Sequence, residues 1–114
     1  MYFVQGAPTA VNATATLTIA QILTFIITCT NTVAVSLTLP TGTLTDAGIL
    51  VGALANDRGF EWEIINLGTT SGAVTLLAGV AHTIVGAAVT AIGTSSRWRT
   101  RKTATNTYVT YRIG

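Results

Sequence analysis

The chain has 114 residues and a formal net charge of +2, with 9% of its residues charged and 49% hydrophobic. Soluble domains are on average about 25% charged, and a chain of this length forms one domain that buries only about 65% of its unfolded surface. We therefore predict that apolar surface stays exposed as a contact site. We predict no nucleic-acid partner, because binding phosphates requires clustered Lys and Arg. The lone cysteine, Cys29, excludes an intrachain disulfide and is predicted to be a buried thiol.

The chain is predicted to begin with an N-terminal arm over residues 1–13, followed by a single β domain over residues 14–114. Residues 1–6 have neither the basic region nor the apolar stretch of a signal peptide, so we expect synthesis in the cytoplasm. Apolar and polar residues alternate over residues 14–19 and 33–39, which is the period-two pattern of strands. Pro40-Thr41-Gly42 is predicted to end the second of these strands.

Two capping boxes predict short helices, because each places a threonine three residues before a residue that can bond back to the cap. The first box runs from Thr18 to Gln21. The second covers residues 43–46 and is predicted to open a helix over residues 47–54. Two glycines in that stretch weaken the second helix.

A turn over residues 55–59 precedes a strand over residues 60–65 with one aromatic face and one largely acidic face. Asn66-Leu67-Gly68 is predicted to end it. Glu61 and Glu63 share the acidic face, roughly 7 Å apart at the usual rise of a strand. That spacing resembles some glycosidase carboxylate pairs. A solvated face or salt bridges are the favoured interpretation, and a cation bound with symmetry copies of an oligomer is a further alternative.

Residues 64–96 contain no charged residue and are long enough to cross a bilayer. Glycine recurs there every seven residues, at 72, 79, 86 and 93, with threonines between, and this composition weakens a helix. We therefore predict no membrane partner, and instead short strands turned by glycines with positive φ, tightly connected as in a meander or at barrel corners. His82, the lone histidine, is predicted to lie in the core or an interface, because no second His or nearby Cys completes a zinc pattern.

A C-terminal hairpin is predicted from residues 97–102, a four-residue turn over 103–106, and residues 107–113. Arginines alternate with other residues on its first strand, so that Arg97, Arg99 and Arg101 share one face. Arg, Trp and Tyr are enriched at protein-interface hot spots. The predicted interface residues are Tyr2, Phe3, Val4, Arg97, Trp98, Arg99, Arg101, Tyr108, Tyr111 and Arg112.

These elements predict an all-β fold, an antiparallel β-sandwich or a small jelly-roll-like barrel of about eight or nine strands with one or two short helices. The sequence has no nucleophile elbow, Walker loop or dinucleotide fingerprint. We predict that the protein is not an enzyme and has no catalytic residue, cofactor or metal site.

Several segments resemble small virion proteins of tailed bacteriophages. They are ATLTIAQIL (residues 15–23), IIT (26–28), LTLPTG (37–42), IINLGTT (64–70), AVTL (73–76), TSSRWR (94–99) and the end of the chain through Tyr111-Arg112. Related β modules occur in capsid decoration proteins and in fibre proteins. The resemblance implies a structural role, usually as a trimer on the capsid shell or on a fibre.

The leading functional prediction is a capsid decoration, or cement, protein that binds the outside of the phage head and stabilises it. Its predicted partners are its own copies, as a homotrimer, and the major capsid protein. Its predicted location is the exterior of the virion capsid, after synthesis in the host cytoplasm. A tail fibre or tailspike module that binds host glycans is the alternative, and a small hydrolase using Glu61 and Glu63 is the third hypothesis.

Overall fold

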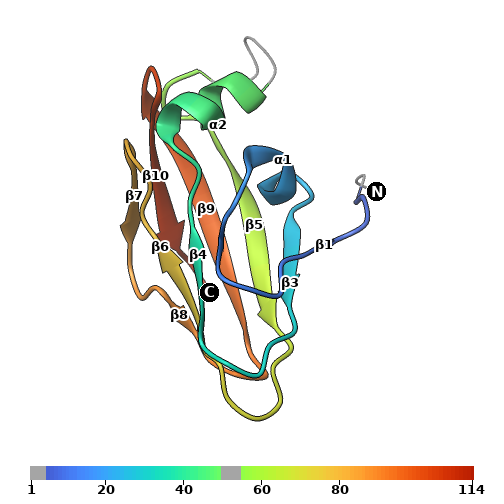
Figure 1. The fold of residues 1–114 in the computed structure, drawn as a ribbon. Helices are drawn as coiled ribbons and strands as arrows, with labels where there is room; N and C mark the ends of the chain where they lie inside the picture. Colours follow the sequence, from blue (N-terminus) through green and yellow to red (C-terminus); the bar gives the residue numbers. More distant parts are fainter. Residues whose placement is uncertain (1–4, 50–54) are drawn as a thin grey trace.

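The computed structural model describes residues 5–49 and 55–114, which form two β-sheets and two short helices (Figure 1). The six-stranded sheet contains, in spatial order, β1 (Thr9–Ala10), β3 (Ile26–Cys29), β5 (Gly59–Asn66), β9 (Ser95–Ala104), β10 (Thr107–Arg112) and β7 (His82–Val85). The four-stranded sheet contains β2 (Ala15–Thr16), β4 (Val35–Thr38), β6 (Val74–Leu77) and β8 (Val89–Thr90). Helices α1 (Ile19–Ile22) and α2 (Gly42–Gly48) pack together at one end of the sheets.

Successive strands from β1 to β9 alternate between the two sheets. β1, β3 and β5 are neighbours in one sheet, and β2, β4 and β6 are neighbours in the other. Each consecutive pair of strands, one in each sheet, therefore forms one coil of the chain. The strands of the next coil pair with them in parallel, β1 with β3 and β3 with β5 in one sheet, and β2 with β4 and β4 with β6 in the other. Solenoid proteins stack repeats in this way to bury a continuous core. Helix α1 lies in the connection from β2 to β3, and α2 lies in the connection from β4 to β5.

The strand directions differ from the prediction. Among the described residues, five of the eight strand pairs are parallel, and β5–β9, β9–β10 and β6–β8 are antiparallel. The antiparallel, jelly-roll-like arrangement is therefore wrong, whereas the mostly β character with two short helices is confirmed. Period-two alternation reports which face a residue occupies, but it does not report the direction of the neighbouring strand.

The two sheets enclose one hydrophobic core. Its largest members are Trp62 on β5 and Trp98 on β9, whose rings stack with centroids 6.1 Å apart. The four-stranded sheet adds aliphatic side chains such as Leu37 and Leu76. Cys29 is fully buried, as predicted, and burial raises the pKa of its thiol.

The first predicted strand is largely wrong. Only Ala15 and Thr16 form a strand, and Ile19 already begins α1, with Thr18 as its N-cap and the predicted capping box present. The segment predicted as an arm contributes β1, which pairs with β3, and Val11 is buried in the core. Residues 9–11 are therefore part of the folded domain.

The second helix begins earlier than predicted, because its cap is Thr41, whose Oγ1 accepts from the Leu44 N–H at 3.1 Å. Part of the predicted helix, residues 50–54, lies outside the described residues. A Cβ on Gly48 would lie 1.9 Å from the Ile19 side chain, so glycine here allows α2 to approach α1. Within the described residues, no helix is long and apolar enough to span a bilayer.

The glycine-rich segment forms short strands, as predicted, and positive φ angles occur at Gly72, Gly86 and Gly93. The strands do not form a meander, because β7 joins the six-stranded sheet while β6 and β8 pair in the other. The C-terminal hairpin is present, but its loop is two residues long. Ala104 pairs with Thr107, and Asn106 takes a positive φ of 56°.

A chain of hydrogen bonds runs through the core from Trp62 to His82. The indole N–H of Trp62 donates to Thr100 Oγ1 at 3.0 Å, and Thr100 and Thr110 bond to each other at 2.8 Å. Thr110 Oγ1 lies 2.7 Å from His82 Nε2, and His82 Nδ1 lies 3.0 Å from the Pro40 carbonyl oxygen. An indole N–H only donates and a carbonyl only accepts, so a neutral His82 must carry its proton on Nδ1.

Folding stability should depend on the titration of His82. Burial lowers the pKa of His82, and its other close neighbour is the ring of Tyr108, whose hydroxyl bonds to Asp46. The unfolded chain takes up this proton near pH 6.5 and the folded chain only at lower pH, so stability from this group is complete above about pH 6.5. As the pH is lowered below about 6.5, the free energy of unfolding should decrease, by at most about 1.4 kcal/mol per pH unit.

Urea unfolding at a series of pH values between neutrality and about pH 5 measures this slope. A His82→Gln variant keeps a polar side chain but cannot titrate, so its stability should change less with pH over that interval. Parallel profiles for the two proteins would show that His82 does not control the slope.

Candidate protein-interaction surface

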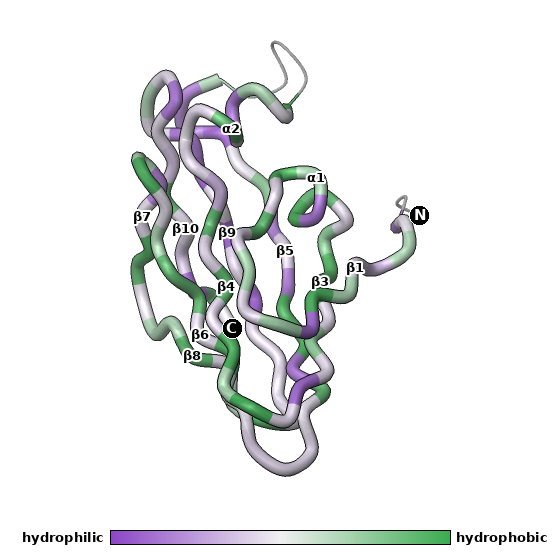
Figure 2. The backbone as a smooth tube through the Cα atoms, in the orientation of Figure 1, coloured by the Kyte–Doolittle hydropathy of each residue, from purple (hydrophilic) through white to green (hydrophobic). Residues whose placement is uncertain are grey.

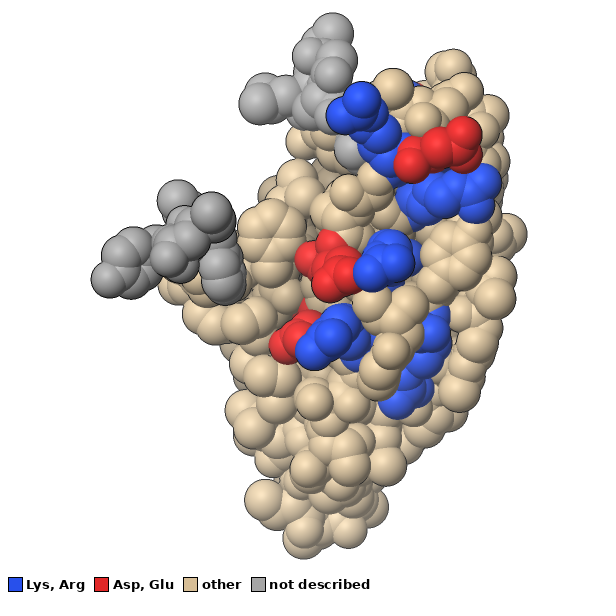
Figure 3. All heavy atoms as spheres, turned by 180° about the vertical axis from the view of Figure 1, so that it is seen from behind, with Lys and Arg blue, Asp and Glu red and all other residues tan. Residues whose placement is uncertain are grey.

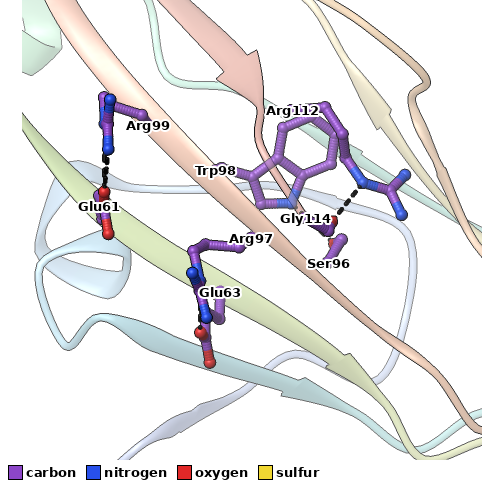
Figure 4. A network of polar contacts seen from close by, with 8 residues as sticks. All are labelled: Glu61, Glu63, Ser96, Arg97, Trp98, Arg99, Arg112 and Gly114. Carbon is purple, nitrogen blue, oxygen red and sulfur yellow. Dashed lines mark hydrogen bonds and ion pairs between the residues drawn. The ribbon is translucent and has the colours of Figure 1, made fainter.

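The outer face of the six-stranded sheet carries charged side chains gathered over β5 and β9 (Figure 3). The antiparallel register places Glu61 opposite Arg99 and Glu63 opposite Arg97. Arg97 Nε lies 3.2 Å from Glu63 Oε1, and Arg99 Nε donates to Glu61 Oε1 at 3.1 Å (Figure 4). The alternation that buries Trp62 and Trp98 therefore also sets opposite charges side by side on the outside.

Arg101 extends this ladder toward the turn before β5. Its Nε lies 3.3 Å from Asp57 Oδ1, and its guanidinium also donates to the Tyr111 hydroxyl. The side chains of the three arginines are 41–57% exposed. Exposed pairs of this kind contribute only about 0–1 kcal/mol each, so their main effect is to hold the arginines in position. The ion-pair face comprises Asp57, Glu61, Glu63, Arg97, Arg99, Arg101 and Tyr111.

A shallow hollow of about 370 Å³ lies on the ion-pair face. It is lined by Asp57, Gly59, Phe60, Glu61, Arg99 and Arg101. Its acidic and basic side chains already bond to one another. The hollow therefore suits contact with another surface better than it suits chemistry on a small substrate.

All four acidic residues of the chain bond to basic side chains. A hydrogen bond from Arg99 lowers the pKa of Glu61. A general acid for glycoside hydrolysis needs a raised pKa instead. The salt-bridge interpretation of Glu61 and Glu63 is confirmed, and the arrangement does not favour the hydrolase hypothesis.

The predicted interface residues occupy different environments. Arg97, Arg99, Arg101 and Tyr111 meet on the ion-pair face. Trp98 and Tyr108 are fully buried and cannot touch a partner, so their assignment to an interface is wrong. They alternate with the outward residues on β9 and β10 and therefore point inward. Tyr2, Phe3 and Val4 lie outside the described residues.

Arg112 serves the fold. Its Nη1 donates to the backbone carbonyls of Ala87 at 3.1 Å and Val89 at 2.8 Å, and its Nε donates to the Gly114 carbonyl at 2.8 Å. Its guanidinium carbon lies 5.4 Å from the centroid of the Trp98 ring, within cation–π range (Figure 4). These bonds tie β10 to β8, so Arg112 is committed to contacts within the molecule.

Asp46 forms a second polar cluster that sequence reasoning did not single out. Its carboxylate bonds to Lys102 Nζ at 2.8 Å, the Tyr108 hydroxyl at 2.6 Å and the Asn106 N–H at 2.9 Å. The hydrogen bonds from Lys102 and Tyr108 are the main cause that lowers the pKa of Asp46 to about 2. Burial of the Tyr108 hydroxyl and its hydrogen bond to the Asp46 carboxylate raise the pKa of Tyr108. The cluster fastens α2 to the C-terminal hairpin. A position on a short helix gives no signal of partners about 60 residues away.

Within residues 5–49 and 55–114, no three His, Cys, Asp or Glu side chains are grouped so that they could hold a metal ion. Comparison of the chain with protein-family models, with curated proteins and with solved structures finds no match.

Replacing Asp46 should destabilise the protein more than replacing an acid of the ion-pair face. Asp46→Asn removes a partly buried charge and leaves Lys102 without its partner, at a cost of about 1–3 kcal/mol at neutral pH. Glu61→Gln is the matched control and should destabilise the protein much less, because its ion pair is exposed and screened by solvent. Denaturant unfolding of the three proteins measures both differences.

The Asp46 effect should also depend on pH. The pKa of Asp46 is lowered to about 2, so its contribution is complete above the unfolded value near 4 and disappears as pH falls toward 2. The gap between wild type and Asp46→Asn should close over that interval. Equal losses for Asp46→Asn and Glu61→Gln would show that the cluster does not fasten the helix.

Proposed function

We propose that this protein is a structural virion component of the cement class, which binds the outside of a phage head and stabilises it. The ion-pair face is the observation that supports this proposal best. It presents three partly exposed arginines, each held in place by a carboxylate, on a sheet rather than in a deep pocket. Ordered arginines reduce the entropy lost on binding, and Arg and Tyr are enriched at interface hot spots.

In this proposal, the ion-pair face contacts the major capsid protein. Arg97, Arg99, Arg101 and Tyr111 donate to carbonyl or carboxylate groups of the shell, and the three paired acids limit the charge left uncompensated. A protein that binds only the assembled shell stabilises that shell by mass action. The assembly that the sequence resemblance implies, a homotrimer, multiplies the contacts and raises the avidity.

A tail fibre or tailspike module that binds glycans is the second candidate. Tyr111 and Phe60 lie on or beside the ion-pair face and are partly exposed, so a sugar ring could stack there. The number of copies per particle separates the two functions. A count near that of the major capsid protein supports the head, whereas a count typical of tail fibres supports the tail.

Exchanging the partners of one ion pair should weaken binding to the capsid without unfolding the protein. In the double variant Glu61→Arg/Arg99→Glu, the net charge and the pairing are kept, but the local polarity of the face is reversed. We expect at least a tenfold loss of affinity for capsids, which corresponds to about 1.4 kcal/mol. Co-sedimentation with capsids stripped of this protein measures the binding, and thermal unfolding checks the fold.

Ala34→Arg changes the charge in the exposed connection between β3 and β4, away from this face, and should leave the affinity for capsids unchanged. Capsids re-coated with wild type should release DNA at a higher temperature than bare capsids, and capsids mixed with the exchanged variant should not. A release temperature unaffected by the wild-type protein would remove the stabilising role. Wild-type binding with no loss in the exchanged variant would move the contact to another face.

A further inference from the structure

Two strands that follow each other along the chain end the two sheets on the same side of the molecule. β7 is the last strand of the six-stranded sheet, and β8 is the last strand of the four-stranded sheet (Figure 1). An edge strand has backbone groups available to pair with another chain. This side of the sandwich therefore presents two edge strands to solvent.

The two edges differ in how they are closed. Arg112 bonds to the carbonyls of Ala87 and Val89 and so covers part of the β8 edge. The Tyr108 N–H on β10 donates to the carbonyl oxygen of Ala81, the residue before β7. In a parallel ladder every second residue of a strand bonds to its neighbour, so on β7 the backbone of Thr83 faces β10. The alternation directs the N–H and C=O of Ile84 away from β10. The backbone of His82, which has the same direction, is closed by bonds with Gly79.

Large apolar side chains surround the β7 edge on both faces of the sandwich. Leu77, Val80, Val85 and Val89 are 43%, 76%, 52% and 49% exposed. We call these four residues, together with the backbone of Ile84, the β7–β8 edge. Figure 2 shows hydrophobic stretches along β6, β7 and β8. The segment that supplies them, residues 64–96, contains no Asp, Glu, Lys or Arg.

Soluble proteins normally protect such an edge with lysine, proline or a bulge. The β7 strand itself, His-Thr-Ile-Val, contains none of the protecting residue types. Its pairing with β10 runs in unbroken register from His82 to Val85. An unprotected, apolar edge is a place where strands add to one another.

The charge pattern identifies what fits against this edge. A charged partner would bury its charges against apolar side chains, and the one cation beside this edge, Arg112, already bonds to three backbone carbonyls, so that burial costs free energy. Another copy of the chain presents the same uncharged edge, with an Ile84 N–H and C=O that can exchange hydrogen bonds. The opposite end of the molecule, β1 and β2, is also uncharged but exposes only threonine and alanine on its strands, which offer much less apolar area.

We propose that the β7–β8 edge is the surface through which copies of this protein associate. Each contact extends the six-stranded sheet across β7 and covers Val85 and its apolar neighbours with the same surface of a second copy. Because the two surfaces are identical, the contact has two-fold symmetry and joins chains in pairs, so it is separate from the contacts of a homotrimer. The association needs this edge alone and does not involve the ion-pair face. It concerns the purified protein, so it can fail or succeed whatever the ion-pair face binds.

A lysine at the edge should break the association. Wild type is expected to sediment as a multimer, and Val85→Lys should shift it at least tenfold toward the single chain at equal concentration. Val33→Lys is the matched control, because Val33 is 66% exposed and apolar but lies in the turn between β3 and β4, and it should leave the multimer intact. Analytical ultracentrifugation measures the mass of all three proteins, and circular dichroism checks their folds.

Val80→Lys provides a second edge variant in a turn, where a fold defect is not expected, and it should act as Val85→Lys does. Hydrogen exchange gives an independent measurement, since the Ile84 amide should exchange at least tenfold more slowly in wild type than in the folded edge variants. A wild-type protein that stays a single chain at high concentration would overturn the proposal. So would a multimer that both edge variants leave unchanged.

Discussion

The register between β5 and β9 is the constraint on which both faces of the six-stranded sheet depend. Trp62 lies opposite Trp98 inside the sandwich, while Glu61 with Arg99 and Glu63 with Arg97 lie outside. A slip of β9 by one residue would bring its arginines into the core and expose the indole ring of Trp98, because side chains alternate strictly along a strand. The stacked tryptophans supply the large apolar area that forbids this slip. The ion-pair ladder is the outward consequence of the same register.

The polar groups inside the sandwich make this packing specific. A buried indole or imidazole without partners would cost roughly 1–3 kcal/mol. Thr100 and Thr110, from the two strands of the hairpin, satisfy Trp62 on one side and His82 on the other. The hydrogen bonds thus connect β5, β9, β10 and β7, the four strands that follow one another in the sheet. Threonine suits these positions because it is compatible with strands and also carries a hydroxyl.

Much of the local structure could be predicted from the sequence, but the arrangement in space could not. The alternation of residues 60–65 predicted the faces of β5, and Thr18 predicted the cap of α1, because both signals are local. Two-residue strands such as β2 are too short for a periodic pattern. The parallel coils pair Val35–Thr38 with Val74–Leu77, and a repeat this short and divergent gives little signal in one sequence. For the surface, alternation identified the outward arginines, but naming Trp98 with them ignored that its neighbours on the strand face the other way.

The distribution of charge follows from the way the chain is wound. All acidic residues and all basic residues except Arg112 lie on α2, on β5 and the turn before it, or on β9. Three ion pairs lie on the ion-pair face (Figure 3), and the fourth, Asp46 with Lys102, joins α2 to the C-terminal hairpin. The coils that flank this face are built from threonine, alanine and aliphatic residues, and their last strands end at the β7–β8 edge. At that end Arg112 bonds to the carbonyl of Val89 on β8 and stacks on Trp98, so it does not protect the β7 edge. Because the few charged residues of the chain are paired on the ion-pair face, the β7–β8 edge is left apolar. Burial of that edge is favourable against another uncharged surface.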